Sequence, residues 1–243
     1  MLEISLDKKD SSGLKVLCLG ALCDDIEIGC GGTILRLLET HGNTEVYWIV
    51  FGSTPQRARE AARCAKAFLQ EARKRKILIK TFRDGFFPYI GGRIKDFFET
   101  LKSTYSPDLI LTHYRYDLHQ DHRVISELTW NTFRDHLILE YEVPKYDGDL
   151  GSPNFFVPLE EEVCARKIRY ILGAFESQRK KHWFSEDLFR GIMRLRGMES
   201  SSHTPFAEGF YCRKLVLSSG LAGTVSALTK GNRQRKIETP ALV

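Results

Sequence analysis

Two adjacent carboxylates, Asp24 and Asp25, stand in the segment 20–33, which follows the apolar run 16–19. A glycine-rich turn is expected to follow them and to lead into an amphipathic helix, so that the pair lies at the end of a first strand. Strand ends of open α/β sheets are where ligands bind. Neighbouring carboxylates at such a place are costly unless a cation or a catalytic task holds them. The segment therefore indicates a metal site, although position 22 is leucine.

A second group of side chains with chemical potential follows the apolar run 109–112. It holds three histidines and two aspartates within ten residues, namely His113, Asp117, His119, Asp121 and His122. In a doubly wound sheet the first and fourth strands are neighbours across the switch point of the topology. We therefore expect members of both groups to converge on one crevice. The expected members are Asp24, Asp25, His119, Asp121 and His122.

Alternating apolar patterns supply the elements that must position these groups. The segments 16–21 and 46–51 are predicted to be buried parallel strands, because their apolar content is nearly continuous. Further strands at 77–79, 109–112 and 137–141 alternate with helices. One helix is expected to be capped by Ser53 or Thr54, with Pro55 in its first turn. This alternation predicts an α/β fold with a doubly wound, mostly parallel sheet and helices on both faces.

The pattern loosens after Pro144. A loop at 147–153 leads to an apolar segment at 154–159 that could form a pairing edge, then to helices at 160–175 and 187–196 and a last strand through 210–217. We expect one domain over residues 1–220. Residues 221–243 are small, polar and basic, and we predict a disordered tail there.

Composition limits the classes of function. The 243 residues are 42% hydrophobic and 28% charged, as in an ordinary soluble domain. No apolar run reaches the ~20 residues of a membrane span, and residues 1–12 are too polar for a signal peptide, so a cytoplasmic location is expected. The six cysteines form no CxxC pair and are expected to be reduced thiols. The net charge of +5 is dispersed along the chain, so no nucleic-acid partner is expected.

Together the two groups resemble the LmbE/PIG-L family of zinc-dependent N-deacetylases. The fingerprint of that family is A-H-(P/C)-D-D-x-E…G-x-G-G-T followed by H-x-D-H. This chain has ALCDDIEIGCGGT at 21–33 and HQDH at 119–122, and the resemblance extends over most of 14–217. It implies a Rossmann-like fold, a Zn²⁺ cofactor and removal of an acetyl group from an amino-sugar conjugate. Because no membrane span is found, a soluble small-molecule conjugate is the expected substrate.

The resemblance also assigns roles at the metal. Asp25 and His122 become zinc ligands, and Asp24 becomes the general base that activates the water nucleophile. Zinc would bring the pKa of a bound water to ~7, which supplies the strong nucleophile that an amide needs. Asp24 and Asp25 can divide the work, since one contacts the metal and the other only the water.

Further roles concern the substrate. His119 stands beside the carbonyl and stabilises the oxyanion, while Asp121 orients that histidine and tunes its pKa. Arg57 matches a position near the substrate sugar, and a surface salt pair with Glu60 explains it equally well. The aromatic stretch 84–89 and the loop 141–153 could form walls of the pocket.

Leu22 stands where the family has its first histidine ligand. Catalytic zinc usually has three protein ligands, and leucine offers no lone pair. Cys23 or His113 could take this place, but neither is favoured. The family often has cysteine at that position beside an intact histidine, and neighbours on an extended segment point in opposite directions. Two interpretations stay open: a deacetylase impaired by Leu22, and a catalytically silent carbohydrate-binding homologue.

Two other classes of protein fit the chain poorly. The glycines at 29, 31 and 32 do not satisfy GxGxxG, and the carboxylates before them would repel a pyrophosphate at the helix N-terminus, which argues against a dinucleotide site. No GxSxG occurs, and no cysteine pairs with a histidine in a recognisable arrangement, which argues against a nucleophilic hydrolase.

Overall fold

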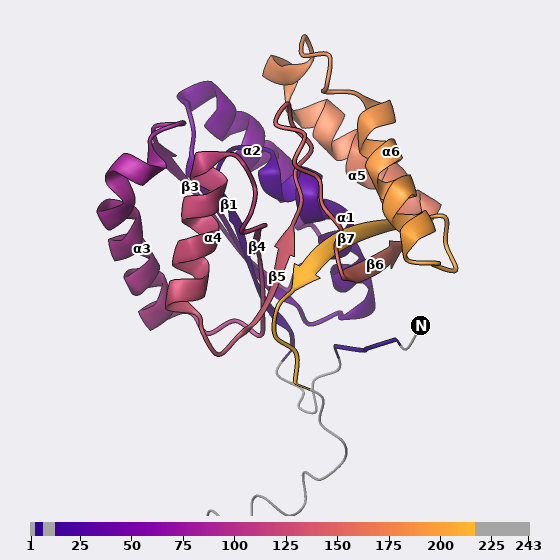
Figure 1. Cartoon of the computed structure of the whole chain (residues 1–243), viewed down its shortest axis with the longest axis horizontal. Helices are drawn as coiled ribbons and strands as arrows, with labels where there is room; N and C mark the ends of the chain where they lie inside the picture. The colour runs from indigo at the N-terminus through magenta and orange to yellow at the C-terminus, as the bar shows by residue number, and fades with distance from the viewer. Residues whose placement is uncertain (1–2, 7–12, 217–243) are drawn as a thin grey trace, which may run out of the picture. The chain divides into compact units, whose positions relative to one another are not determined.

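Nearly continuous apolar runs build the centre of the fold, because parallel strands buried on both faces require them. Such runs form β1 (Lys15–Gly20), β2 (Glu45–Gly52) and β4 (Leu109–His113). They belong to a seven-stranded sheet with the order β3-β2-β1-β4-β5-β7-β6. The structure, a computed structural model, describes residues 3–6 and 13–216 (Figure 1). The tail predicted at 221–243 lies outside the described residues.

The direction of winding reverses at β1, which has β2 on one side and β4 on the other, both parallel to it. β3 (Lys74–Phe82) continues the sheet beyond β2, and β5 (Leu137–Tyr141) continues it beyond β4, again in parallel. The predicted neighbourhood of the first and fourth strands is thus confirmed, as is the doubly wound, mostly parallel α/β fold. The carboxyl ends of β1 and β4 meet at the switch point.

The last two strands run antiparallel to their neighbours. β7 (Phe206–Cys212) pairs with β5, and β6 (Phe155–Leu159) pairs with β7 as the edge strand. The prediction of a last strand at 210–217 began too late. Glu208 is unfavourable in a buried strand by itself, but here the ammonium of Lys167 lies 2.7 Å from its carboxylate. Paired in this way, the charge can be buried and the strand begins at Phe206.

Helices cover both faces of the sheet (Figure 1). One apolar cluster contains side chains of α1 (Asp25–Thr40), α2 (Pro55–Phe68), α5 (Glu161–Ala174) and α6 (Glu186–Glu199). The other contains side chains of α3 (Gly91–Thr104) and α4 (Gln120–Thr132). Alternate residues of β1 serve the two clusters: Val16 and Cys18 the first, Leu17 and Leu19 the second.

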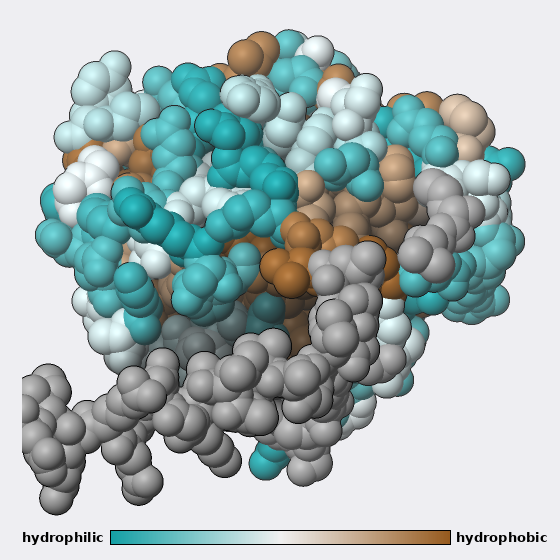
Figure 2. All heavy atoms as spheres, turned by 60° about the horizontal axis from the view of Figure 1, so that its bottom comes forward, coloured by the Kyte–Doolittle hydropathy of each residue, from teal (hydrophilic) through white to brown (hydrophobic). Residues whose placement is uncertain are grey.

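Two short 3-10 helices, η1 (Phe87–Ile90) and η2 (Glu176–Gln178), complete the elements. No helix among the described residues is long and apolar enough to cross a membrane. All six cysteines are free thiols. The face shown in Figure 2 is mostly hydrophilic, with apolar side chains gathered near its centre.

The glycine-rich segment predicted to be a turn lies inside α1. The helix begins at Asp25 and continues through these glycines, with non-helical dihedral angles at Cys30. The glycines are needed for close approach rather than for a turn. A Cβ on Gly29 would lie 2.2 Å from the ring of Tyr141, and one on Gly32 would lie 2.5 Å from Leu159. These glycines therefore let α1 lie directly against the sheet.

We predict that Gly29→Ala destabilises the protein. The Tyr141 ring cannot move aside easily, because it is fully buried and its hydroxyl donates to the Leu19 carbonyl at 2.7 Å. Overpacking of this kind costs about 1–3 kcal/mol of unfolding free energy, measurable by urea denaturation. Gly173→Ala in α5 is the matched control, since a Cβ there would meet nothing within 4 Å. Equal stability of the two variants would contradict the close-approach explanation.

Candidate active site

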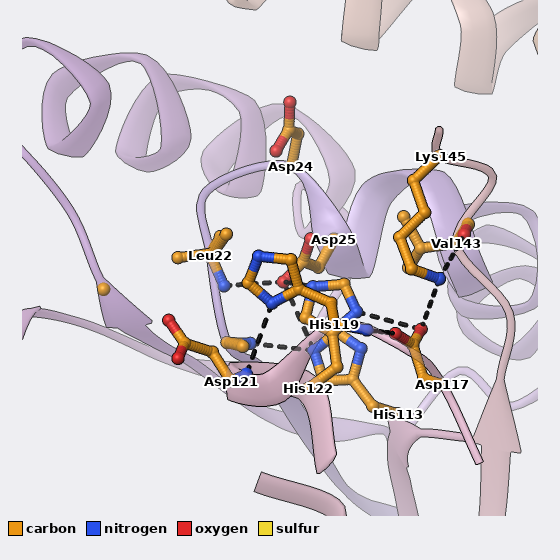
Figure 3. A network of polar contacts seen from close by, with 12 residues as sticks. Leu22, Asp24, Asp25, His113, Asp117, His119, Asp121, His122, Val143 and Lys145 are labelled. Carbon is orange, nitrogen blue, oxygen red and sulfur yellow. Dashed lines mark hydrogen bonds and ion pairs between the residues drawn. The ribbon is translucent and has the colours of Figure 1, made fainter. Parts of the chain in front are cut away.

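The connection between β1 and α1 sends its two carboxylates in different directions. Asp24 has a positive φ of 119°, a strained value for a residue other than glycine, and α1 begins at the next residue. The Leu22 N–H donates to Asp25 Oδ2 at 2.6 Å, which holds that carboxylate beneath the turn. Figure 3 shows Asp25 turned towards the histidines and Asp24 away from them.

His113 brings an imidazole to Asp25 from the last position of β4. It is fully buried, and its Nε2 lies 3.2 Å from Asp25 Oδ2. The Ala21 N–H donates to the same nitrogen at 2.8 Å. Burial and the neighbouring His122 lower the pKa of His113 to about 4, so the ring is neutral at pH 7.

His122 approaches the same carboxylate from the first turn of α4. Its Nε2 lies 3.5 Å from Asp25 Oδ2, and its ring stacks on that of His113 with 3.9 Å between centroids. On its other side, Nδ1 lies 3.0 Å from Asp117 Oδ2. Burial alone would raise the pKa of Asp25, but the two histidines hold it at about 2.

These three side chains could hold a metal ion. Among the described residues, the potential ligand atoms of Asp25, His113 and His122 lie within 4.8 Å of one another. One carboxylate oxygen and two imidazole nitrogens form a donor set that suits Zn²⁺. The contact of His122 Nδ1 with a carboxylate is the usual support of a metal-binding histidine, because it fixes the ring and leaves the Nε2 lone pair for the metal. The donor set therefore fits the cofactor that the sequence predicted.

Arg57, predicted to bind the substrate sugar or to form a salt pair with Glu60, contacts both Glu60 and Asp24. One of its nitrogens lies 2.9 Å from Asp24 Oδ1, and the other lies 3.4 Å from Glu60 and from Ser177 Oγ. Ser177 in turn donates its N–H and hydroxyl to Glu60. Burial raises the pKa of Asp24 to about 7 against the charge of Arg57. Asp24 Oδ2 is buried and has no hydrogen-bond partner in the described part of the chain.

His119 and Asp121 lie at the start of α4, next to His122. The rings of His119 and His122 are 4.5 Å apart, and His119 is the N-cap residue of the helix. Asp121 contacts the His119 ring through its main chain, because its N–H donates to His119 Nδ1 at 3.3 Å. Its carboxylate accepts instead from the N–H groups of Gly85 and Phe87, at 2.6 and 3.1 Å.

The contacts of the Asp121 carboxylate with Gly85 and Phe87 give part of the aromatic stretch 84–89 a structural role. Phe87 is fully buried in the cluster under α3 and α4, whereas Phe86 and Tyr89 are exposed. Only the exposed pair is available as a wall for a ligand. Asp121 thereby ties this segment to the helix that carries His119 and His122.

Sequence reasoning missed two residues behind His122. Asp117 belongs to the histidine-rich segment but has no predicted role, and nothing in the sequence around Lys145 points to the site. The Lys145 ammonium lies 2.9 Å from Asp117 and 2.5 Å from Asp149. Its positive charge balances the two carboxylates. Its contact with Asp117 also links the connection after β5 to the residue that holds the His122 ring. Lys145 lies 28 positions after Asp117 and reaches it only through the folding of the chain, so no local pattern reveals this contact.

Comparisons with known structures first define the class. N,N'-diacetylchitobiose deacetylase from Pyrococcus horikoshii matches with a TM-score of 0.60 and 20% identity, over 82% of this chain and 84% of that one. The teicoplanin deacetylase Orf2 matches with a TM-score of 0.62 and 14% identity, over 82% and 97%. GalB, the 4-carboxy-2-hydroxymuconate hydratase from Pseudomonas putida KT2440, matches with 0.60 and 15%, over 86% and 100%. The fold is that of these enzymes.

A family model matches part of the sequence. Residues 17–133 match the PIG-L family model, described as GlcNAc-PI de-N-acetylase. The resemblance to the LmbE/PIG-L family is thus confirmed over the part of the chain that carries both groups of site residues. A comparison with curated proteins gave no match.

The glutamate of the family fingerprint allows a pH-dependent prediction. Glu27 is fully buried, neither carboxylate oxygen has a hydrogen-bond partner among the described residues, and burial raises its pKa to about 8. In the unfolded chain this pKa returns to 4.5. Between these values the folded state binds a proton that the unfolded state has released, so Glu27 lowers the unfolding free energy as pH rises.

We therefore expect Glu27→Gln to melt at a higher temperature than the original chain at pH 8, with the difference shrinking towards pH 5. Glu127→Gln, at an exposed position of α4, is the control and should leave the melting temperature unchanged at each pH. Melting curves at several pH values check both. A constant difference between Glu27→Gln and the original chain across that range would contradict the prediction.

Proposed function

We propose that this chain is a zinc-dependent N-deacetylase that removes the acetyl group from a small amino-sugar conjugate. The observation that carries the proposal is that Asp24 and Asp25 lie in different surroundings. Asp25 faces two imidazoles, whereas Asp24 keeps one free oxygen and a pKa near neutrality. The family description and the chitobiose deacetylase of the same fold support the class of substrate.

Asp24 is the general base in this proposal. Arg57 holds Oδ1 at 2.9 Å and leaves Oδ2 to accept a proton from water. A carboxylate with a pKa of about 7 takes up and returns a proton efficiently near neutral pH. The same group can therefore deliver the proton to the departing amine.

Asp25 and His122 hold the metal in this proposal, and Asp117 fixes the ring of His122. When bound, Zn²⁺ supplies Lewis-acid polarisation of the amide carbonyl and makes water a stronger nucleophile near neutral pH. The low pKa of Asp25 keeps its carboxylate charged for this task over the whole physiological range.

His119 is placed to stabilise the oxyanion. Because its Nδ1 accepts from the Asp121 N–H, the hydrogen of the neutral ring resides on Nε2. That N–H is a donor beside His122, as an oxyanion hole requires. Asp121 acts in this scheme by fixing the tautomer through its main chain and the neighbouring segment through its carboxylate.

The test is amide hydrolysis with and without Asp24. The zinc-loaded protein is expected to release free amine from N-acetylglucosamine conjugates such as N,N'-diacetylchitobiose, detected by an amine-reactive fluorophore. Asp24→Asn should lower kcat by about 10²–10⁴-fold, the usual contribution of general acid–base catalysis, with its zinc content unchanged. Asp135→Asn is a control at a largely exposed position. A zinc-loaded protein that releases amine from no conjugate of a broad panel would favour the silent carbohydrate-binding homologue.

Asp117 permits a separate prediction about the metal. Asp117→Asn removes the negative charge from His122 Nδ1, so zinc affinity should fall by about 10–100-fold, as for other outer partners of metal-binding histidines. Competition with a zinc-binding dye measures this. Asp135→Asn again serves as control, because Asp135 forms a similar Asp–His pair, at 2.9 Å with His136, on the surface. Equal zinc affinity of Asp117→Asn and the original chain would remove Asp117 from the metal site.

A further inference from the structure

We propose that Lys167 and Glu208 are positioning residues for Asp25, the carboxylate that faces the two imidazoles. They form an ion pair, and this pair joins the two sides of a break in α1 and thereby fixes the turn that carries Asp25. The inference rests on the proposed function only in the choice of zinc as the metal. It concerns residues of α5 and β7, outside the group that could hold the ion.

α1 consists of two helical segments. The dihedral angles of Cys30, φ −145° and ψ 16°, lie outside the helical range. The first segment is the short turn that begins at Asp25, and the second carries apolar side chains such as Ile34 and Leu38 into the core. Main-chain groups beside such a break lose the partners that a regular helix gives them four residues away. The direction of Asp25 therefore depends on what holds the first turn to the second segment.

Lys167 and Glu208 supply hydrogen-bond partners on both sides of the break. In a regular helix the Gly32 N–H donates to the Ile28 carbonyl. Here the Lys167 ammonium donates to the Ile28 carbonyl at 2.7 Å, and the Gly32 N–H donates to Glu208 Oε1 at 2.8 Å. The Thr33 N–H donates to the other oxygen of Glu208 at 2.7 Å. Since Lys167 Nζ also lies 2.7 Å from Glu208 Oε1, the pair is inserted into the hydrogen-bond ladder, a recognised cause of kinks in helices.

The surroundings of the pair are shaped for this insertion. α5 and β7, which carry the two side chains, both lie beside α1 (Figure 1). Lys167 is only 1% exposed and Glu208 only 4%. A Cβ on Gly32 would lie 2.9 Å from Glu208 Oε1, so glycine is needed for the carboxylate to reach the main chain. On the other side of the break, the Cys30 thiol donates to the Ile26 carbonyl at 3.3 Å.

A contribution to stability alone does not explain an ion pair at this place. Burying two charges costs desolvation energy, and apolar side chains of similar volume often leave a protein equally or more stable. The pair does what apolar side chains cannot do, because it keeps Ile28 and Gly32 bonded outside a regular helix. A regular helix would change the direction of the first turn relative to the second segment. Asp25 would then lose its contacts with the Leu22 N–H and the two imidazoles.

The principal variant replaces both charges with apolar side chains, as Lys167→Met combined with Glu208→Met. It contains no unpaired buried charge and is expected to fold, which urea denaturation checks. Its zinc affinity should fall by about 10–100-fold, as for other residues that support a ligand, measured by competition with a zinc-binding dye. Arg36→Met is the matched control and should bind zinc as the original chain does. Arg36 lies on the second segment of α1 and donates to the Pro158 carbonyl at 2.5 Å.

Hydrogen exchange of the metal-free protein reports the position of Asp25 without zinc. The Leu22 N–H donates to Asp25 Oδ2, so its exchange rate depends on where that carboxylate lies. We expect this amide to exchange at least about 10-fold faster in the double methionine variant and at its original rate in Arg36→Met. A merely structural ion pair predicts altered stability with both zinc affinity and Leu22 exchange unchanged. Either of these unchanged in the folded double variant, or the same losses in Arg36→Met, would overturn the proposal.

Lys167→Met combined with Glu208→Gln covers the case in which the double methionine variant does not fold. Glutamine keeps an acceptor for one of the two N–H groups, so zinc affinity should fall less, by about 10-fold. Original affinity in this variant would equally refute the positioning role. The proposed function fails separately. A chain that binds zinc and releases no amine would refute only the deacetylase, whereas an active double variant with original zinc affinity would refute only the roles of Lys167 and Glu208.

Discussion

Asp25 Oδ2 is the atom around which the site is organised. It accepts the Leu22 N–H from its own turn and faces His113 from β4 and His122 from α4. These three segments meet only because β1 and β4 are neighbours at the switch point of the sheet. The position of α1 against the sheet is equally strict, since Gly29 and Gly32 leave no room for a Cβ. A shift of the helix would therefore displace the carboxylate from both imidazoles.

Local sequence patterns predict the main features of the fold. Continuous apolar runs locate β1, β2, β4 and β5, and the alternation with helices fixes the parallel connections and hence the switch point. Two features depended on contacts between distant residues. The glycines of α1 predict a turn when only the sequence is considered, whereas in the structure they allow the close approach of Tyr141 and Leu159. The start of β7 was missed because burial of Glu208 depends on Lys167 from α5.

The site residues likewise fall into two groups: those that local patterns predict and those that depend on contacts between distant segments. Asp25 and His122 are predicted as ligands because each belongs to a long local fingerprint, and they lie 3.5 Å apart in the structure. The sequence does not favour His113, since its proximity to Asp25 follows from the register of β4 against β1 and not from spacing in the sequence. The sequence predicts Arg57 near the substrate, and its contact with Asp24 on another segment has no local signal. Ser177 and Glu60, which hold Arg57 in turn, are joined across an even longer stretch of chain.

The adjacent carboxylates show how one turn produces two different acids. The positive φ of Asp24 sends the two side chains apart, so each enters its own electrostatic environment. Two imidazoles hold the pKa of Asp25 at about 2, whereas burial beside a single guanidinium leaves that of Asp24 at about 7. Neighbouring groups whose pKa values are pushed apart in this way are characteristic of sites that need one permanent anion and one proton carrier. In the deacetylase that we propose, the strain at Asp24 separates these tasks, and Arg57 holds the proton carrier in place.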